Sequence, residues 1–132
     1  MRLIADTNIL VRAVVNDDAP QSRAAHACLL EADTLVLTLT ALCEFAWVLR
    51  TRYRIDRADV ALALRTLVES QNAVCDQPAV ALGLKTLDAG GDFADGVIAA
   101  SGTALGGDTF VSFDRRAVKL LAQTGQATRL LA

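Results

Sequence analysis

The residues best suited to chemistry in this sequence are carboxylates that follow predicted strands. Asp6 comes directly after the apolar run Leu3-Ile4-Ala5, and Asp114 follows Phe110-Val111-Ser112-Phe113. Ligands of open parallel sheets bind at the carboxyl ends of the strands, so we expect both carboxylates at one edge of a sheet. Each also precedes a predicted helix. Because Asp is a favoured helix N-cap, capping alone remains an alternative explanation for either residue.

Glu44 is an acidic residue within an otherwise apolar predicted helix. Its neighbours on the same helix face are Ala41, Trp47 and Val48. A carboxylate in such a segment is costly to bury unless it is paired or binds a metal ion. The sequence therefore predicts a buried Glu44 that belongs to a site, with a structural ion pair to an arginine as the alternative.

Asp92 and Asp95 open another apolar segment, which continues Gly96-Val97-Ile98-Ala99-Ala100. Their spacing of three matches an N-cap and the third helical position, an acidic variant of the capping box. The same spacing places both side chains near the first turn, facing one direction. Capping accounts for Asp92 better than for Asp95, because an apolar helix follows Asp95 and turns that residue toward the domain or a cleft.

Together these acids favour a metal site. Several carboxylates gathered at one pole would repel and raise one another's pKa values, and a divalent cation removes that cost. Ligands that are all oxygen favour Mg²⁺ or Mn²⁺ over zinc. That the acids converge is a hypothesis at this stage, because no sequence pattern shows it directly.

The elements that would position these acids alternate between short apolar runs and longer helical patterns, with no repeat or linker. We expect one domain, residues 1–132, with an α/β fold: a three-layer α/β/α sandwich around a mostly parallel sheet of four or five strands. Continuous apolar runs predict strands buried on both faces. The expected strands are Arg2–Ala5, Thr34–Leu37, Ala73–Cys75, Thr109–Ser112 and Ala127–Leu130. The expected helices are Asn8–Val15, Pro20–Ala32, Ala41–Arg52, Arg57–Ser70, one from Pro78 to before Gly90, Phe93–Ala104 and Ala117–Gln123.

Composition narrows the class of protein. The net charge of −2 argues mildly against a general nucleic-acid binder, although arginines crowd residues 50–57 and 115–116. Three cysteines without CxxC spacing argue against a disulfide framework or a zinc site, so Cys28, Cys43 and Cys75 are interpreted as small core residues. Neither a signal peptide nor an apolar run of membrane length is visible, so we expect a soluble, cytoplasmic protein.

In order and spacing, the acidic segments resemble those of PIN-domain nucleases, and within that family the VapC-type toxins of VapBC toxin–antitoxin systems. The resemblance covers nearly the whole chain. It rests on four short motifs: Leu3-Ile4-Ala5-Asp6-Thr7-Asn8, Cys43-Glu44-Phe45-Ala46-Trp47-Val48-Leu49, Asp92-Phe93-Ala94-Asp95 with Val97-Ile98-Ala99-Ala100, and Val111-Ser112-Phe113-Asp114. One departure is Gly96, where the family often has Ala; a glycine there costs a helix up to about 1 kcal/mol.

The resemblance implies a role for each matched residue. The catalytic acids would be Asp6, Glu44, Asp95 and Asp114, and the ligands of one or two Mg²⁺ or Mn²⁺ ions would be Asp6, Asp95 and Asp114. Auxiliary roles would fall to Asp92, to Asn8 or Thr7 beside Asp6, and to Ser112 beside Asp114. The resemblance also implies a PIN-like, Rossmann-like sheet and a homodimer. It implies a VapB-type antitoxin as the partner that blocks the pocket.

The expected reaction is metal-assisted hydrolysis of RNA phosphodiester bonds by a type II toxin. The chain has one histidine, so cleavage by a pair of histidines is excluded. This residue, His26, is expected on the surface or as a satisfied packing residue. The RNA backbone would be positioned by Arg50, Arg52, Arg115 and Arg116. RNA as the substrate comes from the resemblance alone.

Three other functions remain open. A phosphatase of the haloacid-dehalogenase type wants a second Asp where this chain has Asn8. A phosphoacceptor receiver-like domain could use Asp76, but Asp114-Arg115 stands where its lysine would be needed. The last alternative is a catalytically inactive binding module of the same fold.

Overall fold

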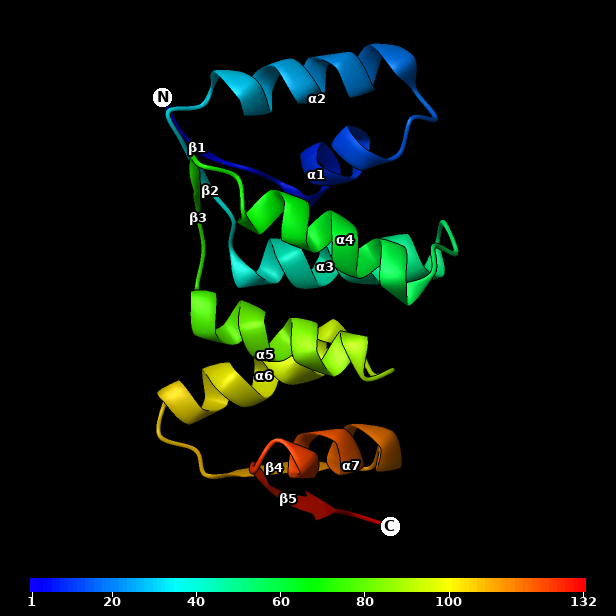
Figure 1. Ribbon diagram of the computed structural model, residues 1–132, viewed down its shortest axis with the longest axis vertical. Helices are drawn as coiled ribbons and strands as arrows, with labels where there is room; N and C mark the ends of the chain where they lie inside the picture. Colours follow the sequence, from blue (N-terminus) through cyan, green and yellow to red (C-terminus); the bar gives the residue numbers. More distant parts are fainter. The chain divides into compact units, whose positions relative to one another are not determined.

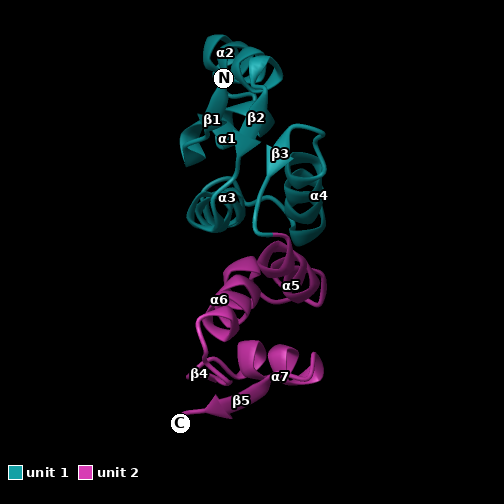
Figure 2. Ribbon diagram, turned by 90° about the vertical axis from the view of Figure 1, so that its left-hand side faces the viewer, with its two compact units in different colours: residues 1–76 teal, residues 77–132 magenta.

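The alternation of apolar runs and helical segments becomes five strands and seven helices in the computed structural model, which describes all of residues 1–132. Every strand pairing is parallel. The predicted fold class, α/β with parallel strands between helices, is therefore confirmed. The chain divides into unit 1 (Met1–Asp76) and unit 2 (Gln77–Ala132), coloured separately in Figure 2. The expectation of a single domain stays a prediction.

Unit 1 holds a three-stranded sheet and four helices. The strand order is β1-β2-β3, and Leu3 lies in register with Leu35. Helix α1 contacts both α2 and α3, and α3 packs against α4 (Figure 1). The elements, in chain order, are β1 (Arg2–Ile4), α1 (Thr7–Val14), α2 (Ala19–Glu31), β2 (Thr34–Val36), α3 (Leu39–Thr51), α4 (Arg57–Val68) and β3 (Ala73–Val74).

Polar caps determine where the unit 1 helices begin. The Asp18 carboxylate accepts a hydrogen bond from the Gln21 amide at 3.1 Å, and the Thr38 hydroxyl accepts one from the Ala41 amide at 3.1 Å. Helix α3 buries Leu42, Phe45 and Leu49, which recur at the spacing of one helix face. This buried face fixes α3, the helix that carries Glu44, within the unit.

Unit 2 holds a two-stranded sheet and three helices. Strands β4 and β5 pair along their full length, from Thr109 beside Ala127 to Ser112 beside Leu130. Helix α7 contacts both strands, and α5 packs along α6. The elements are α5 (Gln77–Asp88), α6 (Phe93–Ala104), β4 (Thr109–Ser112), α7 (Arg115–Gln123) and β5 (Ala127–Leu130).

Helices α5 and α6 approach closely because glycines face the contact. A Cβ on Gly96 would lie 2.4 Å from the Leu82 carbonyl oxygen and 2.7 Å from the Gly83 Cα. A Cβ on Gly83 would lie 2.7 Å from the Phe93 ring. Gly96, which sequence reasoning treats as a small cost to the helix, is thus required by the close packing against α5 and cannot be replaced without shifting backbone.

Several sequence expectations about burial are wrong. The strands were expected to be buried on both faces, but Ile4 is 76% exposed and Val111 is 50% exposed. The single sheet of four or five strands is found as two small sheets, and most of their strands are edge strands with one open side. Cys28 is exposed on α2, so only Cys43 and Cys75 are partly buried, and burial raises the pKa of both thiols.

Other expectations hold. The bounds of α6, β4 and β5 are those predicted, and the remaining elements differ by a few residues at their ends. His26 is exposed, and all three cysteines are free. None of the seven helices combines the length and apolar character that crossing a membrane requires.

Candidate active site

Asp6 lies at the junction of β1 and α1 in unit 1. Ala5 before it is buried, while Asp6 itself is exposed at the N-cap of α1. One carboxylate oxygen, Oδ1, accepts a hydrogen bond from the Thr7 amide at 2.8 Å. The other, Oδ2, accepts none. Asp6 therefore does cap α1, and the cap leaves one of its carboxylate oxygens available to a ligand.

Glu44 departs from the sequence prediction, because it is exposed rather than buried. Helix α3 turns Phe45 and Ala46 into the core and leaves Glu44 and Trp47 on the outer face, where Trp47 is 67% exposed. The alternative of an ion pair with an arginine is also wrong. The Thr7 hydroxyl donates to Glu44 Oε2 at 3.3 Å, so α1 and α3 bring Thr7, Asp6 and Glu44 to one place.

An open pocket of about 320 Å³ surrounds this meeting of α1 and α3. Its polar lining combines the Asp6 and Glu44 carboxylates with the side chains of Thr7 and Asn8. Two arginines and a tyrosine complete it, namely Arg12, Arg52 and Tyr53. Acidic and basic groups therefore share one pocket within unit 1.

In unit 2 the charges of Asp92 and Asp114 act on Asp95. Asp95 is half-buried in the first turn of α6. Burial raises the pKa of Asp95, and the nearby charges of Asp92 and Asp114 raise it further. Since the three acids belong to β4–α7 and α6, unit 2 by itself brings together acids that are far apart in sequence.

Asp114 sits at the N-cap of α7, as capping predicts. Its Oδ1 accepts hydrogen bonds from the Arg116 amide at 2.9 Å and the Ala117 amide at 3.1 Å. The Ser112 hydroxyl oxygen accepts from the Asp114 amide at 3.0 Å, so Ser112 sets the backbone that carries this acid. Both capping bonds use one oxygen, and Asp114 Oδ2 has no hydrogen-bond partner.

Asp92 is the N-cap of α6 by position only, because its side chain makes no capping hydrogen bond. The acidic capping box expected of Asp92 and Asp95 is therefore not formed. The amide of Asp95 bonds instead to the Asp92 carbonyl at 3.2 Å. Both carboxylates remain available for another partner.

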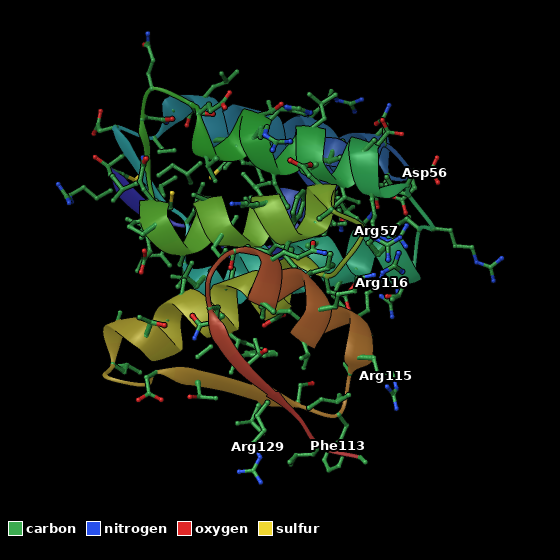
Figure 3. The ribbon with its side chains drawn as sticks, turned by 60° about the horizontal axis from the view of Figure 1, so that its bottom comes forward. Asp56, Arg57, Phe113, Arg115, Arg116 and Arg129 are labelled. Atoms are coloured by element: carbon green, nitrogen blue, oxygen red, sulfur yellow. The ribbon has the colours of Figure 1, made fainter.

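The four arginines expected to bind RNA differ in their surroundings. The Arg50 guanidinium donates to the Ile55 carbonyl at 3.1 Å, which engages it in the turn after α3, and Arg52 lines the pocket of unit 1. In unit 2, Arg115 and Arg116 begin α7 and are exposed. Figure 3 shows Arg115, Arg129 and the 74% exposed Phe113 projecting outward from unit 2.

The donor chemistry of these acids fits a divalent cation, although no coordination shell is preformed. Within neither unit do three His, Cys, Asp or Glu side chains converge closely enough to hold a metal ion. What each unit offers is carboxylate oxygen without a hydrogen-bond partner, at Asp6 and at Asp114, beside further acids. Oxygen-only donors suit Mg²⁺ or Mn²⁺.

Two residues of the unit 1 pocket, Arg12 and Tyr53, were not predicted from the sequence. Tyr53 and Arg12 line it, and both contact Asp17 in the loop after α1. A signal existed for Arg12, which lies one helical turn after Asn8 on the same face. Tyr53 carried no such signal, because it lies beyond the end of α3.

One comparison with known proteins gives a match. The family model described as the PIN domain matches residues 3–122, which include all five candidate acids and most of both units. No curated protein matches the chain.

Proposed function

The chain belongs to the PIN domain family, whose members are generally nucleases that use divalent metals, and from this premise we propose that it is a metal-dependent endoribonuclease. Its substrate would be RNA, its cofactor Mg²⁺ or Mn²⁺, and its reaction the hydrolysis of phosphodiester bonds. We further propose that it is the VapC-type toxin of a type II toxin–antitoxin pair.

The observation that carries this proposal is the position of Asp95 in unit 2, half-buried and close enough to Asp92 and Asp114 to feel their charges. Burial and these two charges raise the pKa of Asp95, so its ionised form costs the fold free energy. A cation in contact with these carboxylates offsets that cost. Carboxylates with raised pKa values are common at functional sites, and here the acid lowers stability, so a functional role explains its position.

The roles proposed for individual residues follow from their free atoms. In unit 1, Asp6 would offer a metal ion the oxygen that capping leaves free. In unit 2, Asp114 would offer its free oxygen and Asp95 its half-buried carboxylate. When bound, a divalent ion lowers the pKa of a water molecule and offsets charge on the phosphate. Glu44, kept in place by the Thr7 hydroxyl, would accept a proton from the attacking water.

Auxiliary roles are proposed for four polar residues. Thr7 orients Glu44, and Asn8 presents an amide to the same pocket. Ser112 sets the backbone of Asp114, and Asp92 adds negative charge beside Asp95. Arg52, Arg115 and Arg116 would hold the RNA backbone, whereas Arg50 would act through the turn that it supports.

The test is incubation of purified protein with total cellular RNA in Mg²⁺, in Mn²⁺ and in EDTA. Discrete cleavage is expected with either metal and none with EDTA. Asp6→Asn and Asp114→Asn should abolish it while keeping the helix caps, because Asn caps as well as Asp. Asp18→Asn is the matched control, because Asp18 caps α2 outside the candidate set. This variant should cleave RNA as the parent protein does.

Absence of cleavage by the parent protein, with no thermal shift on adding metal, would point to an inactive binding module instead. Cleavage that survives EDTA would refute the metal dependence. Cleavage that survives Asp6→Asn would remove that residue from the proposed ligands.

The toxin role has a cellular test. Expression of the chain alone should arrest growth, and expression of Asp6→Asn should not. Co-expression of the VapB-type antitoxin should restore growth and yield a complex that does not cleave RNA. We propose a homodimer acting in the cytoplasm, and light scattering of the purified protein would measure its mass in solution.

A further inference from the structure

The pocket of unit 1 has an acidic end and a basic end. At one end the Thr7 hydroxyl bonds to Glu44; at the other, Arg12 and Tyr53 share Asp17 as a partner. Helices α1 and α3 therefore run alongside each other between the two ends. At 1.5 Å per residue, Thr7 and Arg12 lie roughly 7.5 Å apart along α1, enough for one nucleotide.

Asp17 joins two side chains at the basic end of the pocket. Arg12 forms an ion pair with Asp17 Oδ1, and the Tyr53 hydroxyl donates to Asp17 Oδ2 at 3.2 Å. The ion pair balances the charge of Arg12. Arg52 lines the same pocket, is exposed and forms no ion pair, so it is the cation free to meet a phosphate.

The turn that follows α3 contains a strained residue next to Tyr53. Arg54 adopts a left-handed conformation with φ of 53°, which costs a residue other than glycine roughly 1–2 kcal/mol. The turn is closed by the Ile55 amide on the Leu49 carbonyl at 2.9 Å and by Arg50 on the Ile55 carbonyl. Strain that the surrounding structure over-determines is characteristic of functional positions.

We propose that Tyr53 and Arg52 form a nucleotide subsite next to the catalytic carboxylates. The Tyr53 ring stacks on an unpaired base beside the cleaved phosphate, and the Arg52 guanidinium holds the next phosphate along the strand. The inference rests on the proposed function and adds its substrate-positioning residues. Stacking on an aromatic ring tolerates any base, so the subsite selects single-stranded RNA without reading its sequence.

The acidic and basic ends of the pocket determine where the phosphates of a bound strand would lie. Asp6 and Glu44 repel a bare phosphate, whereas Arg52 attracts one, so a strand in the pocket places an uncleaved phosphate at the basic end. Arg12 and Asp17 act as positioning residues, because Asp17 bonds to both Arg12 and the Tyr53 hydroxyl.

The experiment measures binding of a fluorescein-labelled, single-stranded RNA of mixed sequence in EDTA, so that nothing is cleaved. Tyr53→Leu should weaken binding by about 5- to 150-fold, the effect of losing one stacked base. Tyr53→Phe should bind more tightly than Tyr53→Leu, because it keeps the stacking ring and loses only the hydroxyl that bonds to Asp17. With an abasic strand of the same length, Tyr53→Leu and the parent should bind equally.

Arg52 is tested by salt dependence. Arg52→Gln should reduce the slope of log affinity against log salt by about 0.7, the value for one phosphate contact on a single strand. Arg23→Gln removes an exposed arginine of α2 outside the pocket and should leave the slope unchanged. This variant keeps the inference testable even if Tyr53→Leu folds poorly.

The outcomes separate the subsite from the proposed function. A parent protein that binds and cleaves RNA, with Tyr53→Leu and Arg52→Gln unchanged in affinity and salt slope, overturns the subsite alone. An equal loss of affinity on the abasic strand also overturns it, because the loss would then be structural. A parent protein that neither binds nor cleaves RNA overturns both.

Discussion

Replacing Gly96 with alanine should destabilise the protein, although alanine is the better helix former. Alanine in place of an interior helical glycine gains about 1 kcal/mol from propensity. At Gly96 the added Cβ would stand 2.4 Å from the Leu82 carbonyl oxygen and 2.6 Å from the Thr86 hydroxyl oxygen. The first of these distances is about 1 Å below ordinary van der Waals contact, and the carbonyl belongs to backbone that cannot rotate away.

The magnitude follows from these opposing terms. Overpacking a tight contact costs about 1–3 kcal/mol, and a clash with helix backbone belongs at the upper end. Subtracting the propensity gain leaves a loss of about 2 kcal/mol. Gly102 lies later in α6, and a Cβ added there would meet nothing within 4 Å, so Gly102→Ala should instead stabilise by about 0.5–1 kcal/mol.

The assay is urea unfolding of the two variants followed by circular dichroism, with thermal midpoints as a second measure. The two substitutions are chemically identical and lie on one helix, so their opposite signs isolate the contact with α5. Gly96→Ala should also reduce cleavage, because separating α5 from α6 moves the turn that carries Asp95. A Gly96→Ala protein as stable as Gly102→Ala would refute the reasoning.

Three further predictions concern stability. Arg54→Gly should raise the free energy of unfolding by about 1 kcal/mol and Arg54→Ala should not, because only glycine relieves a left-handed φ; urea titration measures both. Burial and the charges of Asp92 and Asp114 raise the pKa of Asp95, so the contribution of Asp95 to stability falls as pH rises above about 4. In EDTA, Asp95→Asn should therefore melt above the parent at pH 7, with no gain below pH about 4. The bond from Arg12 lowers the pKa of Asp17, so Asp17→Asn should melt below the parent at pH 7, and the two curves should converge as pH falls below about 4. Equal midpoints at pH 7 would contradict the last two predictions.

Much of the fold was predictable because it depends on local patterns. The alternation of apolar runs and helical segments placed all five strands and all seven helices to within a few residues. Asp6 and Asp114 were predicted to follow strands and cap helices, and both do. Capping signals are short-range, so they survive whatever the rest of the chain does.

Burial was predicted less well, because it depends on which faces meet. An apolar stretch around Glu44 suggested burial of the whole helix, yet α3 buries one face and exposes Glu44 and Trp47 on the other. Likewise, apolar strands suggested a sheet covered on both sides, and the edge strands leave Ile4 and Val111 open. Composition along a segment does not say which side its neighbours occupy.

The sequence by itself determined the types and order of the elements and the carboxylates that follow them, since these rest on interactions between residues close along the chain. Tertiary structure alone decided that Thr7 reaches Glu44, that Asp17 holds Arg12 and Tyr53 together, and that Gly96 lies against α5. Each of those outcomes joins residues of different elements. Such contacts are set by how helices pack in three dimensions, and no local pattern in the chain encodes them.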